Sequence, residues 1–349
     1  MESKKFYNHA IAMLRVVAIF AVIAIHTTTR ILEATGYNIE KFPFTLFFNQ
    51  SLRFAVPLFF LISGFVLELN YREKMHYPTY IKKRASRIIL PYLCWSIFYY
   101  VFVYHYPLDA KTFLSALLNG DASYQLYFIP TLILFYILFP FFHHLYPLFV
   151  KKPFFICLLI LELLLLTQDY YFAPIHLAIP IRIALLNFEI FFLGMVASHH
   201  EEKILAFVKK WLVLFLLLLL FSPFILYQES RHNFLATRNI DAIYSQWHPS
   251  VFLYTLLVCS ILFFVFTKVV RVNRALQTVS KLSFFVFFVH VAILYLFWYG
   301  VGEGMLKKIG AKQPQETLYE LLFFAFVTIT SFALGFLFHK IPKLRMLTG

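Results

Sequence analysis

The sequence predicts an all-α integral membrane protein with about ten transmembrane helices and both termini in the cytoplasm. Of its 349 residues, 61% are hydrophobic and only 14% are charged, whereas soluble domains contain about 45–50% apolar and about 25% charged residues. Apolar runs long enough to cross a bilayer recur along the whole chain. Basic residues gather in alternate connections between these runs.

The expected helices follow from the polar and charged breaks, because a spanning helix needs about 20 mostly apolar residues. Ten segments result: 9–31, 44–68, 88–106, 124–147, 153–168, 179–198, 211–228, 250–268, 282–300 and 318–338. The apolar pattern begins near the N-terminus and is never replaced by a long polar stretch. We therefore expect one membrane domain over residues 1–349, with no cleavable signal peptide and no extracytoplasmic soluble domain.

The orientation follows from the basic residues, since cytoplasmic loops of membrane proteins are enriched in Lys and Arg. With both termini inside, the cytoplasmic parts carry Lys4, Lys5, the cluster from Arg72 to Arg87, Lys151, Lys152, Lys203, Lys209, Lys210, Lys268, Arg271, Arg274, Lys281, Lys340, Lys343 and Arg345. The net charge of +14 follows mostly from this rule and suits contact with anionic membrane lipids. It requires no nucleic-acid partner.

Cysteine and histidine spacing gives no sign of a metal site. Cys94, Cys157 and Cys259 each lie inside a long apolar run, and no histidine spacing resembles that of a zinc site. We expect neither a metal ion nor a disulfide framework.

The first apolar run, MLRVVAIFAVIAIHTTTR, contains two ionisable side chains, Arg15 and His26. Eleven residues correspond to about three helical turns and about 16 Å, so both side chains lie on one face. Ionisable groups at such depth usually face the protein interior or a water-filled cavity, and imidazole is suited to proton transfer at neutral pH. The alternative is that Arg15 extends to the inner headgroups and His26 is a packing residue.

A basic cluster in YIKKRASRIILPY lies at the inner end of the third expected helix. Arg84 and Arg87 are three residues apart and project from one face. Arginine presents paired donors to phosphate oxygens, so this face is suited to a polyphosphate ligand. An ordinary anchor for lipid headgroups is the alternative.

Several other positions are weaker candidates. Arg53, near the outer end of segment 44–68, is placed to meet an anionic or hydroxyl-rich ligand, and Ser63 with Gly64 allows close approach of another backbone. Glu189 lies inside an apolar segment, so it needs a partner; Arg182 shares its face at a long spacing, and both a structural and a catalytic role remain open. Glu162 has no identifiable partner. His290 is open to a core role, and His143 and His144 look interfacial.

The chain resembles the acyltransferase type 3 family of integral membrane O-acyltransferases. The resemblance rests on the R-x10-H pair Arg15 and His26, on VPLFFLISGFVL with Ser63, and on Arg84 and Arg87 followed by Pro91 and Tyr92. It continues in LYFIP, FFLGM and SKLSFFVFFVH, in the family's order. One departure is Gln125-Leu126-Tyr127-Phe128, where many members have a His-Leu-Trp-Phe-like stretch.

This resemblance implies a function. Family members move an acyl group, usually acetyl, from cytoplasmic acyl-CoA to a hydroxyl of a carbohydrate or lipid-linked glycan. His26 resembles the family's essential histidine, Arg15 its first-helix arginine, and Arg84 with Arg87 the pair thought to meet the CoA phosphates. Acyl-CoA is then a donor substrate, with no permanently bound cofactor, and the location is the bacterial plasma membrane.

Two alternatives remain open from the residues. His26 would act as general base on the acceptor hydroxyl or as transient acyl carrier; we favour the base. A transporter or flippase for a polysaccharide or lipid-linked sugar would use the same polar face, although the chain lacks the Gly- or Pro-broken helix pairs typical of many transporters.

Overall fold

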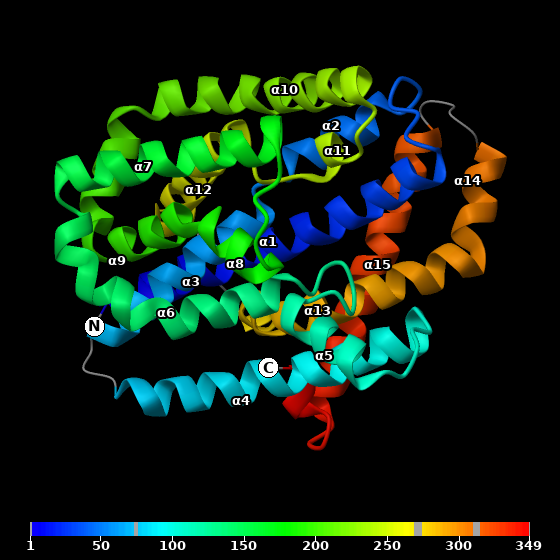
Figure 1. Cartoon of the computed structure of the whole chain (residues 1–349), viewed down its shortest axis with the longest axis horizontal. Helices are drawn as coiled ribbons and strands as arrows, with labels where there is room; N and C mark the ends of the chain where they lie inside the picture. Colours follow the sequence, from blue (N-terminus) through cyan, green and yellow to red (C-terminus); the bar gives the residue numbers. More distant parts are fainter. Residues whose placement is uncertain (1, 73–75, 269–273, 310–314, 349) are drawn as a thin grey trace. The chain divides into compact units, whose positions relative to one another are not determined.

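The computed structural model describes residues 2–72, 76–268, 274–309 and 315–348, and these residues form helices without any strand. Figure 1 shows the helices with their labels. Within the described residues, eight helices are long and apolar enough to cross a membrane, or nine if one bent pair counts as a single span. The protein is an all-helical, multi-pass membrane protein.

All ten expected segments correspond to helices, but three differ from a single unbroken helix. Segment 44–68 comprises two helices, α2 (Pro43–Ser51) and α3 (Ala55–Arg72). Segment 88–106 is the shorter apolar helix Arg87–Val103, because the preceding turns of that helix carry the basic cluster. Segment 179–198 is broken into α8 (Ile179–Leu185) and α9 (Phe188–Lys210), which meet at 52°. At this break the side chain of Asn187 donates to the carbonyl oxygen of Ile183. The expectation of about ten transmembrane helices thus compares with eight candidate spans among the described residues, or nine with the bent pair.

The chain divides into two compact units, each described by itself. Unit 1 comprises residues 1–55, 211–246 and 253–341, and unit 2 comprises residues 56–210, 247–252 and 342–349. The two boundaries near residues 247 and 252 place the first turn of one helix, α12 (Pro249–Lys268), in unit 2 and the rest in unit 1.

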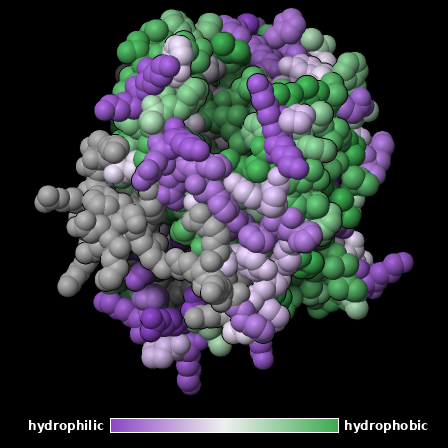
Figure 2. Space-filling view, turned by 90° about the vertical axis from the view of Figure 1, so that its left-hand side faces the viewer, coloured by the Kyte–Doolittle hydropathy of each residue, from purple (hydrophilic) through white to green (hydrophobic). Residues whose placement is uncertain are grey.

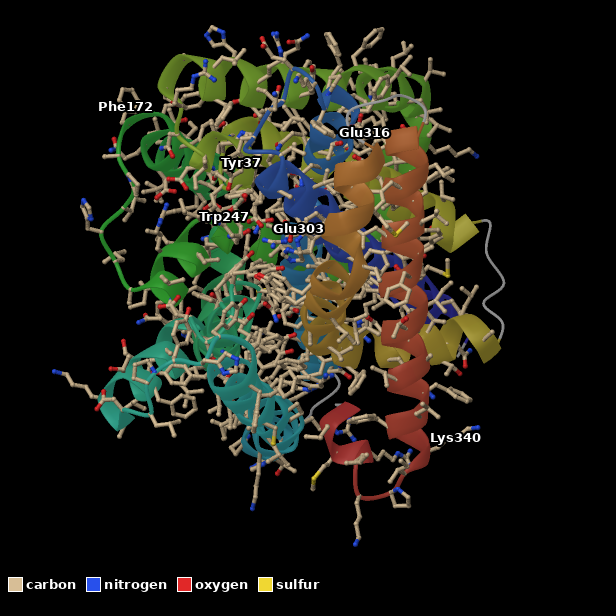
Figure 3. All side chains as sticks on the ribbon, turned by 90° about the vertical axis from the view of Figure 1, so that its right-hand side faces the viewer. Tyr37, Phe172, Trp247, Glu303, Glu316 and Lys340 are labelled. Atoms are coloured by element: carbon tan, nitrogen blue, oxygen red, sulfur yellow. The ribbon has the colours of Figure 1, made fainter. Side chains whose placement is uncertain are left out.

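Unit 1 is built around α1 (Glu2–Ala34), which packs against α13 (Arg274–Phe297), α2 (Pro43–Ser51) and α15 (Gln315–Lys340). Figure 3 marks α15 by residues near its two ends, Glu316 and Lys340. The other helices of this unit are α10 (Leu212–Thr237), α11 (Asp241–Tyr244), most of α12, η3 (Trp298–Gly302) and α14 (Glu303–Ile309). Small and branched side chains such as Ala18 and Ile19 of α1 are fully buried, which allows close helix packing.

Unit 2 contains most of α3 (Ala55–Arg72) together with the helices up to α9. The remaining elements are α4 (Tyr77–Phe98), η1 (Tyr99–Val103), α5 (Ala110–Asn119), α6 (Phe128–Phe149), α7 (Lys152–Thr167), η2 (Gln168–Phe172) and the C-terminal turn η4 (Arg345–Thr348). Its helix α6 packs against α8 and α7.

A reciprocal glycine contact joins α3 to α9 in unit 2. A Cβ added to Gly64 would lie 2.0 Å from the carbonyl oxygen of Phe191, and one added to Gly194 would lie 2.1 Å from that of Leu61. Only glycine permits backbones to approach this closely. The close approach predicted at Gly64 is therefore confirmed.

Much of the helical surface is hydrophobic. Along α10, the side chains of Val213, Leu220 and Phe221 are each more than half exposed, as expected for a helix that contacts lipid. Figure 2 shows such hydrophobic surface adjoining hydrophilic side chains on one face of the molecule.

Candidate functional site

Arg15 and His26 lie on one uninterrupted helix, as predicted. Helix α1 extends from Glu2 to Ala34, so helical rise separates the two residues by about 16 Å along the axis. Both side chains are half-buried, whereas Val22 and Ile23 of the same helix are almost completely buried. His26 thus lies within an apolar helix and is half-buried.

His290 of α13 lies beside His26. The centroids of the two imidazole rings are 5.1 Å apart, and His290 is fully buried. Its Nδ1 is 3.0 Å from the carbonyl oxygen of Val286, which assigns the ring proton to Nδ1 because a carbonyl oxygen only accepts. Nε2 of His290 therefore carries a lone pair, and this buried atom has no hydrogen-bond partner.

A set of polar side chains at the end of α2 fixes the turn of α1 that carries His26. The amide nitrogen of Asn49 donates to the carbonyl oxygen of Ile25 at 3.1 Å and to the hydroxyls of Thr28 and Thr29, each at 2.9 Å. Gln50 donates to the carbonyl oxygen of Ile243 and accepts from the hydroxyl of Ser230. Because these buried groups are hydrogen-bonded to one another, they give α1 a defined position.

Arg53 belongs to the same network. Its guanidinium donates to the carbonyl oxygens of Tyr244 at 2.7 Å and Ile243 at 2.6 Å, and to the side-chain oxygen of Asn49. Arg53 is only 4% exposed, and its charge acts on His26 electrostatically. The arginine holds α11 and α2 together near His26, while its predicted contact with an acceptor stays a prediction.

In unit 2, Arg84 and Arg87 lie on α4, as the sequence predicts. Arg84 is half-buried and Arg87 is exposed, so the pair presents positive charge within the first half of the helix. Lys82 beside them is also exposed. This arrangement is suited to an anionic group with several oxygens.

Ser63 of α3 directs its hydroxyl to its own helix. Its Oγ donates to the carbonyl oxygen of Phe59 at 2.8 Å, a common intrahelical bond for serine. The side chain is half-buried, and its supporting role toward the acceptor stays a prediction.

Glu189 and Arg182 do not share a helix face, because α8 and α9 are separate helices. Arg182 instead forms a bidentate pair with Asp169, with nitrogen–oxygen distances of 2.7 and 2.6 Å. Glu162 of α7 is buried, and one of its side-chain oxygens, Oε1, has no hydrogen-bond partner. Both oxygens of the fully buried Glu189 carboxylate lack a hydrogen-bond partner.

A further polar cluster was missed from the sequence. The fully buried carboxylate of Glu68 on α3 contacts Nδ1 of His143 at 2.9 Å and Nε2 of His199 at 2.7 Å. His143 was expected to be interfacial. Glu68 at the end of its apolar segment was the available signal, since a carboxylate there requires partners. In the part of the chain that the structure describes, no group of three such side chains has the arrangement of a metal site.

Comparisons with known proteins agree with the sequence resemblance. A family model described as an acyltransferase domain matches residues 8–340. A protein of Staphylococcus aureus strain MRSA252, named "Probable poly-beta-1,6-N-acetyl-D-glucosamine export protein", is 27% identical over 304 residues, which cover 80% of this chain and 81% of that protein. The protein of the same name from strain Mu50 / ATCC 700699 is 26% identical over 298 residues with the same coverage. No solved structure matches the chain significantly. Because the family model covers nearly the whole chain, this protein belongs to the acyltransferase 3 family.

Proposed function

We propose that the protein is a membrane O-acyltransferase that moves an acyl group, expected to be acetyl, from cytoplasmic acyl-CoA to a hydroxyl of a cell-surface or lipid-linked carbohydrate. The observation that carries this proposal is the imidazole of the half-buried His26 beside the fully buried imidazole of His290, in a chain of the acyltransferase 3 family. The proposal places the protein in the bacterial plasma membrane with both termini in the cytoplasm.

His26 acts as the general base in this proposal. Its ring nitrogen accepts the proton of the acceptor hydroxyl while the hydroxyl oxygen attacks the thioester carbonyl. The carbon–sulfur bond then breaks, and the CoA thiolate recovers the proton from the imidazolium. The lone pair on Nε2 of His290 lies on the neighbouring ring and stabilises the imidazolium. General-base catalysis of the kind proposed for His26 accelerates reactions by about 10²–10⁴-fold.

The donor site follows from charge. CoA is polyanionic, and its phosphates would bind the guanidinium groups of Arg84 and Arg87 on α4 through charge-assisted hydrogen bonds. The family resemblance also assigns Arg15 of α1 to donor binding. The extended pantetheine arm would then cover the distance of about 16 Å that helix rise sets between Arg15 and His26. Acyl-CoA is a substrate in this scheme, and no permanently bound cofactor takes part.

Acyl transfer by the purified protein tests the proposal. The protein is reconstituted into lipid and supplied with labelled acetyl-CoA and a β-1,6-linked N-acetylglucosamine oligomer, and labelled ester in the glycan is measured. Label in the oligomer that is removed by mild alkali supports the proposal, because esters hydrolyse under those conditions. If the protein is folded and inserted but no label enters the oligomer, the result contradicts the proposed acyl transfer.

A second candidate function is export of a polysaccharide, and the printed name of the Staphylococcus aureus relatives favours it. In that case the polar residues of α1 would contact a passing glycan, and no ester would form. Movement of a labelled oligomer across sealed vesicles without acyl-CoA distinguishes this candidate from the acyltransferase.

A further inference from the structure

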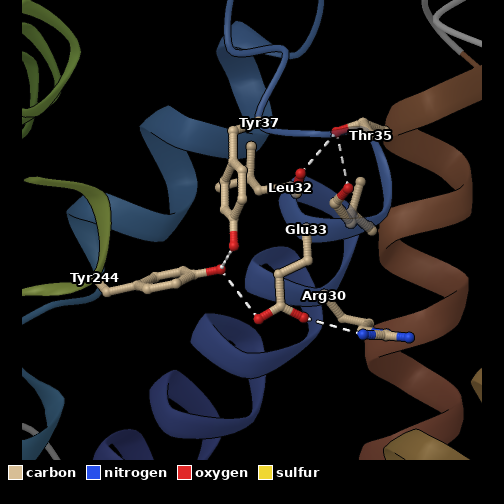
Figure 4. A network of polar contacts seen from close by, with 7 residues as sticks. Arg30, Leu32, Glu33, Thr35, Tyr37 and Tyr244 are labelled. Carbon is tan, nitrogen blue, oxygen red and sulfur yellow. Dashed lines mark hydrogen bonds and ion pairs between the residues drawn. The ribbon is translucent and has the colours of Figure 1, made fainter. Parts of the chain in front are cut away.

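A chain of hydrogen bonds lies at the end of α1, beyond His26 (Figure 4). The carboxylate of Glu33 accepts from Nη1 of Arg30 at 3.1 Å and from the hydroxyl of Tyr244 at 3.0 Å. The hydroxyl of Tyr37 is 2.7 Å from that of Tyr244. Since the single hydroxyl proton of Tyr244 goes to Glu33, Tyr37 is the donor to Tyr244. The oxygen of Tyr37 keeps its lone pairs for a further donor.

Aromatic rings surround the cationic end of this chain. The guanidinium of Arg30 lies 4.9 Å from the centroid of the Trp298 ring, with Tyr295 and Tyr299 at 5.7 and 5.5 Å. The rings of Tyr295 and Tyr299 are within 11° of parallel. Tyr299 is 69% exposed, so an exposed aromatic residue stands beside hydrogen-bonding groups, a combination typical of ligand sites.

The backbone at Tyr37 is strained. Tyr37 has φ +57° and follows Gly36 at φ +63°, and a bulky side chain in the left-handed region raises the conformational energy. The backbone N–H of Tyr37 donates to the carbonyl oxygen of Leu32 at 2.8 Å, which closes the end of α1. Glycine or asparagine would make this turn with less strain, but neither would bring a phenolic hydroxyl to Tyr244. The strain therefore indicates a requirement for the side chain rather than for the turn.

Glu33 shares a helix face with His26. The two residues are seven positions apart, which corresponds to about two turns and about 10 Å along the axis. One six-membered sugar ring, built from bonds of about 1.5 Å, covers only about half of that distance. A molecule that places a hydroxyl at His26 and also contacts Glu33 and Tyr37 is therefore longer than a monosaccharide.

We propose that Arg30, Glu33, Tyr37, Tyr244 and Tyr299 form a subsite for a second sugar unit of the acceptor, next to the unit that is acylated. This inference rests on the proposed function. The acceptor is then an oligosaccharide or polysaccharide of at least two units, which lies along the outer half of α1. Hydroxyl and amide groups of the sugar exchange hydrogen bonds with Tyr37, Glu33 and Arg30, and the Tyr299 face covers an apolar side of the ring.

Two acceptors of different length test the proposal. Wild-type protein, Glu33→Gln and Tyr37→Phe, all reconstituted in lipid, are supplied with acetyl-CoA and either N-acetylglucosamine or its β-1,6-linked tetramer. We expect the KM for the tetramer to be about tenfold higher in each variant than in the wild type. A change of this size corresponds to the loss of one hydrogen bond to a charged or polar partner. The KM for acetyl-CoA and transfer to the monosaccharide should not change. Tyr227→Phe, which alters a tyrosine whose ring contacts Phe47 and Phe224, is the matched control.

Direct binding of the tetramer, measured without acetyl-CoA, separates this inference from the proposed function. If wild-type protein transfers no acyl group but binds the tetramer about tenfold more tightly than Tyr37→Phe does, as expected for a lost hydrogen bond, the proposed function fails and the subsite stands. Equal binding of the tetramer by wild type, Glu33→Gln and Tyr37→Phe overturns the subsite. Equal KM changes for monosaccharide and tetramer also overturn it, because they show a general structural effect.

Discussion

The imidazole of His290 on α13 lies beside that of His26 on α1, with ring centroids 5.1 Å apart. The bond from Nδ1 of His290 to the carbonyl oxygen of Val286 leaves an acceptor lone pair on Nε2. The half-buried His26 and its fully buried neighbour thus take different roles. This relationship determines the first two predictions.

His26→Ala should remove nearly all acyl transfer while leaving insertion intact. The substitution takes a costly polar group out of the membrane, but it also removes the base, whose assistance is worth about 10²–10⁴-fold. Transfer from labelled acetyl-CoA by reconstituted protein is the measurement. The control is His176→Ala, because His176 is exposed in a loop. A folded His26→Ala protein with more than about a tenth of the wild-type rate, well short of the expected loss, rules out the catalytic role.

His290→Phe should lower kcat and leave the KM for acetyl-CoA unchanged. The phenyl ring fills the buried space but has no lone pair beside His26, so the imidazolium loses a partner. A loss of about tenfold is expected, the size of one hydrogen bond to a charged group. His290→Asn, which keeps a polar side chain, should retain more activity than His290→Phe. Identical kcat values for both variants and wild type would show that His290 only packs.

Arg84→Ala and Arg87→Ala should each raise the KM for acetyl-CoA by about tenfold or more, because charged hydrogen bonds to phosphate are lost. The KM for the glycan acceptor should change little. Lys151→Ala is the matched control, since Lys151 is an exposed basic residue on a connection of the same predicted side. If the KM for acetyl-CoA is unchanged in both arginine variants, the basic cluster does not bind the donor and only contributes to the orientation of the helices in the membrane.

Gly64→Ala should destabilise the protein more than an alanine substitution at a glycine whose added Cβ would meet no other atom. The new Cβ would meet the carbonyl oxygen of Phe191 at 2.0 Å, and overpacking of this kind costs about 1–3 kcal/mol. Gly304→Ala is the control because no atom lies within 4 Å of its added Cβ, and its effect should stay below about 1 kcal/mol. Thermal unfolding of the purified variants measures the difference. Equal midpoints would contradict the backbone contact between α3 and α9.

The proposed topology predicts opposite locations for two reporters. A reporter fused after Gly349 should be cytoplasmic, and one inserted after Arg238, in the turn between α10 and α11, should be external, because the basic residues favour the inner side. Protease access in intact cells and in inverted vesicles provides the readout. A cytoplasmic reporter at Arg238 would contradict the proposed orientation.

The sequence by itself determined the membrane class, the order of the helices, the shared face of Arg15 and His26 and the membership of the acyltransferase 3 family. The first three features depend on composition and on the regular period of a helix, so neighbouring residues in the chain contain the information. The family membership rests instead on the ordered set of motifs along the chain. The basic pair Arg84 and Arg87 was found for the same reason.

The tertiary structure decided which helix faces meet. It placed His290 beside His26 across 264 positions of the chain, paired Arg182 with Asp169 instead of Glu189, and surrounded Glu68 with His143 and His199. It also gave Arg53 backbone carbonyls as partners. Helical periodicity specifies neighbours only within one unbroken helix. Because α8 and α9 meet at a 52° bend at Leu186 and Asn187, periodicity does not predict which residues of the two helices share a face. Contacts between helices depend instead on the packing of small residues and on the satisfaction of buried polar groups, which no spacing within a single segment specifies.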